Sequence, residues 1–199
     1  MAASAALGMK EICITAKHQG GFTLWPSNHT PYGVQAATNW RGGKGDVLKE
    51  FVAAAKRWNI AVCYYINPLD DGYLAEIANV SAPEFEARQK GMLTELLQPG
   101  SPYGPVHRLW FDGSGNQRPK SLLKNYAGYY DSCFELIRTV SPHTLISPYR
   151  GDVCISTGSL YMNNGPNPNS SDASSCGKFN ESGRFFHPIE MHGITMQEG

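Results

Sequence analysis

The sequence predicts an α/β fold built on a parallel sheet. Between residues 11 and 147, short runs of β-prone residues alternate regularly with segments of helical periodicity, which implies successive βαβ units. The β-prone runs are almost continuously apolar, as in parallel strands that are buried on both faces. The chain has 199 residues, of which 41% are hydrophobic, and this is enough to form the core of one domain.

Charge and composition exclude several classes of partner. The chain has 17 basic and 17 acidic side chains, so no electrostatic feature indicates binding to nucleic acid or to an anionic membrane. No apolar run reaches the length that is needed to span a bilayer. The first residues lack the basic leader and the long apolar segment of a signal peptide. The sequence leaves the cellular compartment and the oligomeric state unknown.

Four strands and three helices are predicted in alternation. The strands are runs rich in Val, Ile and aromatic residues, and the helices have apolar side chains at helical spacing along one face. The predicted strands cover residues 11–16, 60–66, 106–112 and 144–147, and the predicted helices cover residues 46–58, 81–97 and 121–140.

The predicted helices carry recognisable signals at their ends. Asp46 suits the N-cap of the first helix. Ser81 and Glu84 form the Ser-x-x-Glu pattern of a capping box at the start of the second helix, and a Ser-Pro pair at residues 141–142 closes the third. A stripe of tyrosines lies on the face of the third helix that must pack, which predicts a core role for Tyr126, Tyr129 and Tyr130.

The five cysteines indicate no metal site and no cofactor. None of them forms a CxxC pair, and none lies near a His at the spacing of zinc ligands. Cys13 and Cys63 lie inside apolar runs, where we expect small buried thiols. Cys154 and Cys176 flank a loop and are candidates for a disulfide in an oxidising compartment.

The region beyond residue 151 differs from the alternating part. Residues 160–180 are rich in Asn, Pro, Ser and Gly and have no apolar period, which predicts a long loop. We expect this loop to lie within a single domain of residues 1–199. Four Asn-x-Ser/Thr triplets favour a secretory route only weakly, because such triplets often arise by chance. They begin at Asn28, Asn79, Asn169 and Asn180.

Two predicted strands end in side chains that suit a reaction site. Asp112 ends the third run, beside Trp110, and a glycine follows it. In β/α barrels, side chains at the carboxyl ends of strands point into the active site, so Asp112 is a candidate catalytic group. The alternative is an Asp that only caps a turn. His18 follows the first strand, with Trp25 close by, and is a second candidate, although a lone His is more often structural.

Three segments and one residue pair match a known set of motifs in the same order along the chain, and the ordered set is more specific than any one segment. Residues 15–27, TAKHQGGFTLWPS, resemble the pattern T-x-K-H-H-x-G-F-x-x-W-P-S. Residues 45–51, GDVLKEF, resemble G-D-V-V-x-E-F, and residues 109–113, LWFDG, match V-W-F-D-G. Tyr64-Tyr65 falls where the same pattern has a Y-Y strand. Over residues 11–113 the chain therefore resembles the α-L-fucosidase family, glycoside hydrolase family 29.

The resemblance implies a fold and a reaction. The fold is a (β/α)8-like barrel, the TIM barrel, and the reaction is the retaining hydrolysis of terminal α-L-fucosyl residues on oligosaccharides or glycoproteins. Asp112 would attack the anomeric carbon and form a glycosyl-enzyme ester. A second carboxyl group about 5 Å away would protonate the leaving oxygen and then deprotonate water. The family also suggests a secreted or lysosomal location.

The same resemblance assigns substrate-binding residues at the matching positions. His18 would hold sugar hydroxyls, and Tyr65 would lie near the fucose. Trp25 and Trp110 would pack on the apolar face of the sugar. Gln19 stands where the family has a second His, and its amide can bind hydroxyls but cannot titrate.

The chain departs from the family at the proton donor. Ser159 aligns with the position where many members carry the acid/base Glu, and a hydroxyl is too weak an acid for that role. The best-placed spare carboxylate is Glu190, in the segment His187-Pro188-Ile189-Glu190, and Glu181 is the next candidate. We assign Glu190 as the candidate acid/base.

The chain also departs from the family in length. A closed barrel needs about 250 residues, and only about four strand-helix units are predicted here, so we expect a partial chain of the catalytic barrel. Two alternatives to an active α-L-fucosidase follow from these departures. One is a fucose-binding pseudoenzyme that has lost its proton donor, and the other is an inactive fragment that cannot fold alone.

Overall fold

The computed structural model describes residues 1–70, 72–111, 122–123, 126–147, 154–156 and 189–191. The chain divides into two units, Met1–Thr144 and Leu145–Gly199, and each is described by itself. The predicted loop at residues 160–180 lies outside the described residues, so the expectation of one domain over residues 1–199 stays a prediction.

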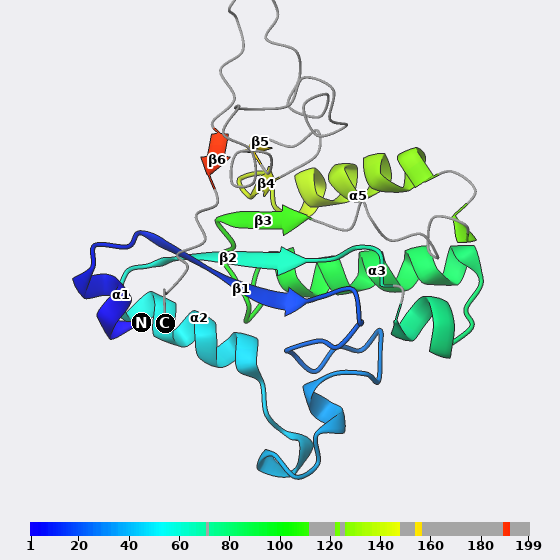
Figure 1. The fold of residues 1–199 in the computed structure, drawn as a ribbon, viewed down its shortest axis with the longest axis horizontal. Coiled ribbons are helices and arrows are strands. Elements are labelled where there is room, and N and C mark those ends of the chain that lie inside the picture. Colours follow the sequence, from blue (N-terminus) through cyan, green and yellow to red (C-terminus); the bar gives the residue numbers. More distant parts are fainter. Residues whose placement is uncertain (71, 112–121, 124–125, 148–153, 157–188, 192–199) are drawn as a thin grey trace, which may run out of the picture. The chain divides into compact units, whose positions relative to one another are not determined.

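The first unit consists of strands that alternate with helices along the chain (Figure 1). A fourth strand, β4, follows its last helix and opens the second unit. The alternation confirms the predicted α/β class. In chain order the elements are β1 (Glu11–Lys17), α2 (Val47–Arg57), β2 (Ala61–Ile66), α3 (Ala82–Leu97), β3 (Arg108–Phe111), α5 (Tyr126–Val140) and β4 (Leu145–Ser147).

Short elements complete the first unit. A helix, α1 (Ala2–Ala6), precedes β1 and buries none of its side chains. Two 3₁₀ turns, Val34–Ala36 and Arg41–Gly43, lie in the connection between β1 and α2. A π-helical turn, Tyr73–Ile77, lies between β2 and α3. None of the described helices has the length and hydropathy that crossing a bilayer requires.

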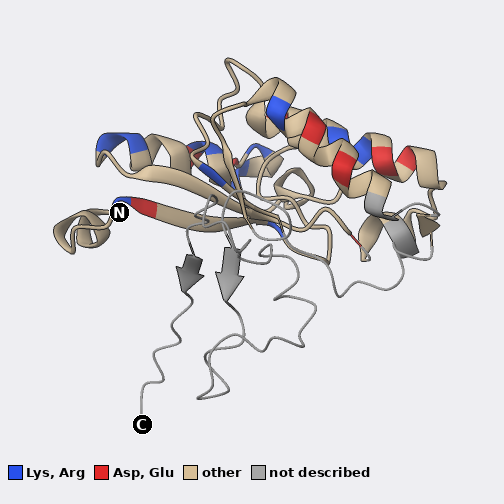
Figure 2. Ribbon diagram, turned by 90° about the horizontal axis from the view of Figure 1, so that it is seen from above, with Lys and Arg blue, Asp and Glu red and all other residues tan. Residues whose placement is uncertain are grey.

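The strands of the first unit form a parallel sheet in the order β1, β2, β3 (Figure 1). The register pairs Cys13 with Cys63 across β1 and β2, and Tyr65 with Trp110 across β2 and β3. Figure 2 shows that the longer helices of this unit lie mainly along one side of the strands. One face of the sheet is therefore covered, and the other face carries the residues discussed below.

The core lies between the covered face of the sheet and the helices. Tyr64, Leu109 and Phe111 are completely buried, and each contributes about 1.5–3 kcal/mol when it leaves water. The ring of Phe111 meets Tyr130 at 5.4 Å between centroids, and the Tyr129 hydroxyl donates a hydrogen bond to the Pro68 carbonyl at 2.8 Å. The predicted core role of the tyrosine stripe is thus confirmed for Tyr129 and Tyr130.

The helix starts agree only partly with their sequence signals. Asp46 is the N-cap of α2 and accepts a hydrogen bond from the Lys49 amide at 3.0 Å, as predicted. Ser81 is the N-cap of α3, but its hydroxyl makes no capping bond, so the predicted capping box is wrong. The Glu84 carboxylate instead pairs with Arg88 one turn later, at 2.7 Å, because residues four apart face each other on a helix.

The predicted free thiols at Cys13 and Cys63 are also a correction, because the two residues form a disulfide. They are opposite each other in the register of β1 and β2, with their Cα atoms 4.2 Å apart. Each run by itself indicates only a buried cysteine, and the pairing of the strands reveals that the two cysteines are close together. Cys133 remains a free, buried thiol.

A charged cluster ties the amino ends of β1 and β3 together. Glu11 Oε1 accepts from Arg108 Nε at 2.8 Å and pairs with its Nη2 at 2.6 Å. His107 Nδ1 lies 2.5 Å from Glu11 Oε2. Two guanidinium nitrogens on one carboxylate oxygen make charge-assisted hydrogen bonds, so this pair holds the two outer strands of the unit in register across β2.

The second unit contains β4 and a small parallel sheet of β5 (Cys154–Ser156) and β6 (Ile189–Met191). The register pairs Ile155 with Glu190. We predicted β4 but neither of the other two strands. Cys176 lies outside the described residues, so its pairing with Cys154 stays a prediction.

Stability is expected to fall at alkaline pH. Burial raises the pKa of Tyr64, Tyr103 and Tyr129 above the ordinary 10.0, and the nearby Asp46 carboxylate raises it further for Tyr64 and Tyr103. Burial also raises the pKa of the Cys133 thiol to about 12. The unfolded chain ionises these groups at lower pH than the folded chain. The contribution of these neutral side chains to the free energy of unfolding is therefore complete below pH 9 and is lost as the pH rises towards 12. Urea unfolding between pH 8 and 11 should show a decreasing midpoint, with a shallower decrease in Tyr103→Phe.

Candidate functional site

Three of the predicted site residues meet at the carboxyl ends of neighbouring strands. Tyr65 of β2 and Trp110 of β3 are register partners, and their rings contact edge to face at 5.4 Å. The His18 ring, just after β1, stacks on Tyr65 at 5.3 Å with an interplanar angle of 10°. We call His18, Tyr65 and Trp110 the aromatic cluster.

The aromatic cluster lies on the sheet face opposite the helix-covered core. Successive side chains of a strand point to opposite faces, and the residues on either side of Tyr65 and Trp110 are buried. Tyr65 and Trp110 are themselves half-buried, and His18 is exposed. The cluster therefore forms a surface of aromatic rings and one imidazole at the carboxyl ends of the strands, where a ligand can contact it.

An irregularity in β1 brings His18 to this face. Thr15 opposes Tyr65, but the register then shifts, and Lys17 opposes Ile66. Lys17 is completely buried, so the side chain that follows it turns to the other face, where it reaches Tyr65. Bulges of this type re-aim side chains at sheet edges and near active sites.

The turn that carries His18 is fixed by the loop that follows β2. Gly21 closes the turn through a bond from its amide to the His18 carbonyl at 3.0 Å, and its φ is +87°. A Cβ on Gly21 would lie 2.3 Å from the Asp70 carboxylate. Asp70 is completely buried and accepts from the Tyr73 amide at 2.9 Å. Glycine at position 21 is therefore required both by the backbone conformation and by this close approach.

A second contact between the same loops involves Gln19. Its carbonyl accepts a hydrogen bond from the Gly72 amide at 3.1 Å. A Cβ on Gly72 would lie 2.6 Å from the Gly20 carbonyl oxygen, so the two backbones touch. The Gln19 side chain itself is exposed. Sequence reasoning missed Asp70 and Gly72, and the sequence signals available were the paired glycines at 20–21 and an Asp-Gly pair at 71–72.

Trp25 requires a correction, because it belongs to the core and offers no surface to a sugar. Its side chain is completely buried, and its indole N–H donates to Glu95 Oε2 at 2.9 Å. The same carboxylate accepts from the Ser27 hydroxyl at 2.7 Å and from the Asn28 amide at 2.8 Å. Glu95, on α3, is far from Trp25 in sequence, so only the tertiary fold reveals this acceptor.

We expect Glu95→Ala to destabilise the chain. The substitution leaves three donors, from Trp25, Ser27 and Asn28, without their acceptor, and an unsatisfied buried donor costs about 1–3 kcal/mol. Because the site is partly open to water, we expect a loss of roughly 2–3 kcal/mol in the free energy of unfolding. Urea denaturation measures it, with Glu86→Ala on the same helix as the control; equal effects would contradict the prediction.

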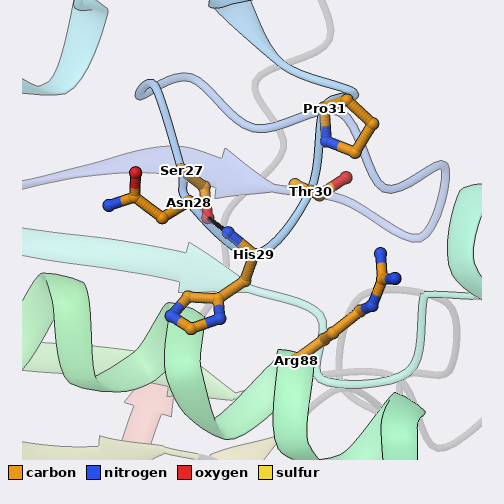
Figure 3. Close-up of a pocket in the computed structure, with 6 residues that line it drawn as sticks. All are labelled: Ser27, Asn28, His29, Thr30, Pro31 and Arg88. Carbon is orange, nitrogen blue, oxygen red and sulfur yellow. Dashed lines mark hydrogen bonds between the residues drawn. The ribbon is translucent and has the colours of Figure 1, made fainter.

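A separate pocket of about 450 Å³ lies between the loop after β1 and α3 (Figure 3). The His29 ring packs over Gly91 of α3, where a Cβ would lie 2.3 Å from it. Arg88, which extends towards Pro31 in Figure 3, is already paired with Glu84. None of the predicted site residues lines this pocket, whose walls are Ser27, Asn28, His29, Thr30, Pro31 and Arg88.

The remaining predicted residues are not placed at the aromatic cluster. Asp112 follows β3 directly, but it lies outside the described residues, as do Ser159 and Glu181. Glu190 belongs to β6 of the second unit. The assignments of Asp112 as nucleophile and Glu190 as acid/base therefore stay predictions. Within the described part of the chain, no group of three or more His, Cys, Asp or Glu residues is arranged to hold a metal ion.

Comparison with known proteins identifies related sequences. The sequence profile described as "Alpha-L-fucosidase" matches residues 1–174. Alpha-L-fucosidase 1 of Arabidopsis thaliana is 34% identical over 139 residues, which are 70% of this chain and 25% of the relative. The chain thus spans about a quarter of the length of the curated relatives that it matches.

Solved structures show the same likeness. A putative α-L-fucosidase from Bacteroides thetaiotaomicron has a TM-score of 0.64 and 29% identity, over 78% of this chain and 33% of that one. A GH29 α-L-fucosidase from the same organism, trapped as a covalent intermediate with 2-fluoro-fucosyl fluoride, has a TM-score of 0.56 and 25% identity. It is matched over 72% of this chain and 32% of that one. These likenesses confirm the predicted fold class, a part of a (β/α)8-like barrel.

Proposed function

Because the chain belongs to the α-L-fucosidase family, glycoside hydrolase family 29, we propose that it carries the nucleophile side of a retaining fucosidase site. The substrates are terminal α-L-fucosyl residues of oligosaccharides or glycoproteins. The observation that supports this most directly is the aromatic cluster, in which three neighbouring strand ends bring His18, Tyr65 and Trp110 together. Strand ends of this kind carry the active site in β/α barrels.

The direction of β3 supports Asp112 as the nucleophile. Strand side chains alternate between faces, and Trp110 lies on the face of the aromatic cluster. Asp112 follows Trp110 by two positions in the sequence, which is the spacing of side chains that share one face of a strand. In the proposed reaction, this carboxylate attacks the anomeric carbon, the bond to the leaving oxygen breaks, and a fucosyl ester forms, which water then hydrolyses. The covalent intermediate trapped in the related GH29 enzyme supports this route.

The aromatic cluster is proposed to bind the sugar. Fucose has an apolar side formed by C–H groups, and aromatic faces such as that of Trp110 bury such surface favourably. His18 and Gln19 are exposed beside it and can exchange hydrogen bonds with hydroxyls.

The proton donor is proposed to be Glu190, and the departure from the family at the acid/base position favours a second candidate function. In the resemblance to the family, Ser159 stands at the position of the acid/base Glu, and a hydroxyl is too weak an acid for that role. A chain without a donor would still bind fucose as a lectin-like pseudoenzyme. Both functions use the aromatic cluster to bind fucose, but only the fucosidase hydrolyses its substrate.

An aryl α-L-fucoside separates these functions, because aryl leaving groups need little help from an acid. The purified 199-residue chain is expected to release one equivalent of the phenol in a burst, followed by slower turnover. If calorimetry shows that the chain binds fucose and no burst of phenol is seen, the chain is a pseudoenzyme and not a fucosidase. Absence of both binding and burst, together with a cooperative thermal transition, would contradict both functions.

A further inference from the structure

The triplet Asn79-Val80-Ser81 has a conformation that suits covalent modification. Asn79 and Ser81 are exposed, and Val80 is buried at 8% exposure. Asn79 has a φ of +46°, a conformation found in turns, where asparagine is tolerated. The turn connects the π-helical turn with α3, so the middle residue anchors it while the outer two side chains point to solvent.

The described part of the fold uses neither the Asn79 carboxamide nor the Ser81 hydroxyl. In the part of the chain that is described, no hydrogen bond holds the Asn79 carboxamide, and the Ser81 hydroxyl does not cap α3 although it occupies the N-cap position. A Ser at the N-cap normally bonds to the first turn of its helix. Both groups that a glycosylation acceptor needs, an amide and a hydroxyl two residues later, are therefore available at once.

The triplet at Asn28 differs in this respect. Its Thr30 is only 3% exposed, and the Thr30 hydroxyl accepts a hydrogen bond from the Tyr32 amide at 3.1 Å. The backbone N–H of Asn28 donates a hydrogen bond to the Glu95 carboxylate at 2.8 Å. The folded chain thus uses the hydroxyl of this triplet, and the Asn28 triplet provides a comparison within the same unit.

A second, independent observation is the disulfide between Cys13 and Cys63. Disulfides form and persist in oxidising compartments such as the lumen of the endoplasmic reticulum. Transfer of oligosaccharides to asparagine takes place in the same lumen. The exposed triplet and the disulfide therefore indicate the same environment.

We infer that Asn79 is an N-glycosylation site. The co-substrate is a lipid-diphosphate-linked oligosaccharide. The Asn79 amide nitrogen attacks the anomeric carbon of its first sugar, a C–N bond forms, and the bond from that carbon to the diphosphate oxygen breaks. The lipid diphosphate leaves with the electron pair, and one amide proton passes to a base. The glycan also shields Ile77, which is 71% exposed two residues earlier.

The test is expression of the full chain in a eukaryotic cell behind a cleavable secretion leader, followed by peptide mass spectrometry. Removal of glycans by an amidase converts the modified asparagine to aspartate. We expect this conversion at Asn79 in the wild type and in Asn28→Gln, and its loss in Asn79→Gln and Ser81→Ala. Ser81→Thr, which keeps a hydroxyl, is the matched control and should retain the glycan.

The same sample provides the opposing outcomes. An unmodified Asn79 peptide in secreted protein, whether or not another triplet is modified, would overturn the inference. So would a glycan that persists in Ser81→Ala at the wild-type level. Far-UV circular dichroism of each variant verifies that loss of the glycan is not loss of the fold. If Asn79→Gln fails to fold, the comparison of Ser81→Ala with Ser81→Thr gives the result.

Discussion

Replacing Asp112 with Gly is expected to lower kcat for an aryl α-L-fucoside by about 10⁴-fold or more, as removal of a covalent nucleophile does in other hydrolases. The reason is that no other group of the site would form the fucosyl ester, and water attacks the sugar far more slowly. Because aryl fucosides need little acid assistance, the measurement is insensitive to the identity of the proton donor. Steady-state release of the phenol gives the ratio of rates.

Azide provides the decisive control for this variant. Glycine leaves a space where the carboxylate stood, and a small anion can enter it and attack the anomeric carbon. We expect azide to restore phenol release and to yield a β-fucosyl azide, because a single displacement inverts the α configuration. Asp112→Asn, which fills the space, should be inactive with and without azide. A rate equal to that of the wild type in Asp112→Gly would contradict the assignment of Asp112 as the nucleophile and with it the proposed fucosidase mechanism.

Loss of the disulfide is expected to have the largest effect on stability. Cys13 and Cys63 are 50 residues apart, and closing a loop of this length in the unfolded chain corresponds to about 4 kcal/mol in the chain-entropy account. The loop contains α2 and the whole Trp25 segment, so its closure also limits the disorder of the unfolded site loop. We expect Cys13→Ala/Cys63→Ala to lower the free energy of unfolding by about 2–4 kcal/mol.

A reductant separates this effect from lost packing. Wild-type chain in dithiothreitol should unfold at a lower urea concentration than oxidised chain, and dithiothreitol should shift the midpoint of the double variant much less. Cys133, which is buried and free, serves as an internal reference, because its alkylation should require unfolding in both states. Equal midpoints for oxidised and reduced wild-type chain would contradict the prediction.

Local patterns were sufficient for the larger elements of the fold. Each predicted helix and strand up to residue 147 has a counterpart in the structure, since apolar periodicity reports directly which face of an element is buried. Asp46 was predicted as an N-cap from its neighbours alone, because the capping bond spans only three residues. The same reasoning failed at Ser81, where a carboxylate that should have closed the capping box pairs with Arg88 instead.

Local sequence patterns did not predict the contacts of the site between residues that are far apart in the chain. The buried state of Trp25 depends on Glu95, which is on another element, and the position of His18 depends on a register shift in β1 and on the loop at Asp70 and Gly72. Each of these contacts joins residues that no helical or strand period relates.

Periodicity and motifs that are local in the chain were enough to predict the α/β class, the order of its elements, the family, and the positions of His18, Tyr65 and Trp110 at strand ends. The bond between Cys13 and Cys63, the burial of Trp25 and the contact of the three aromatic rings became visible in the folded chain. They depend on register, because the packing of the whole sheet sets which residues face each other across two strands, and neither strand does so alone.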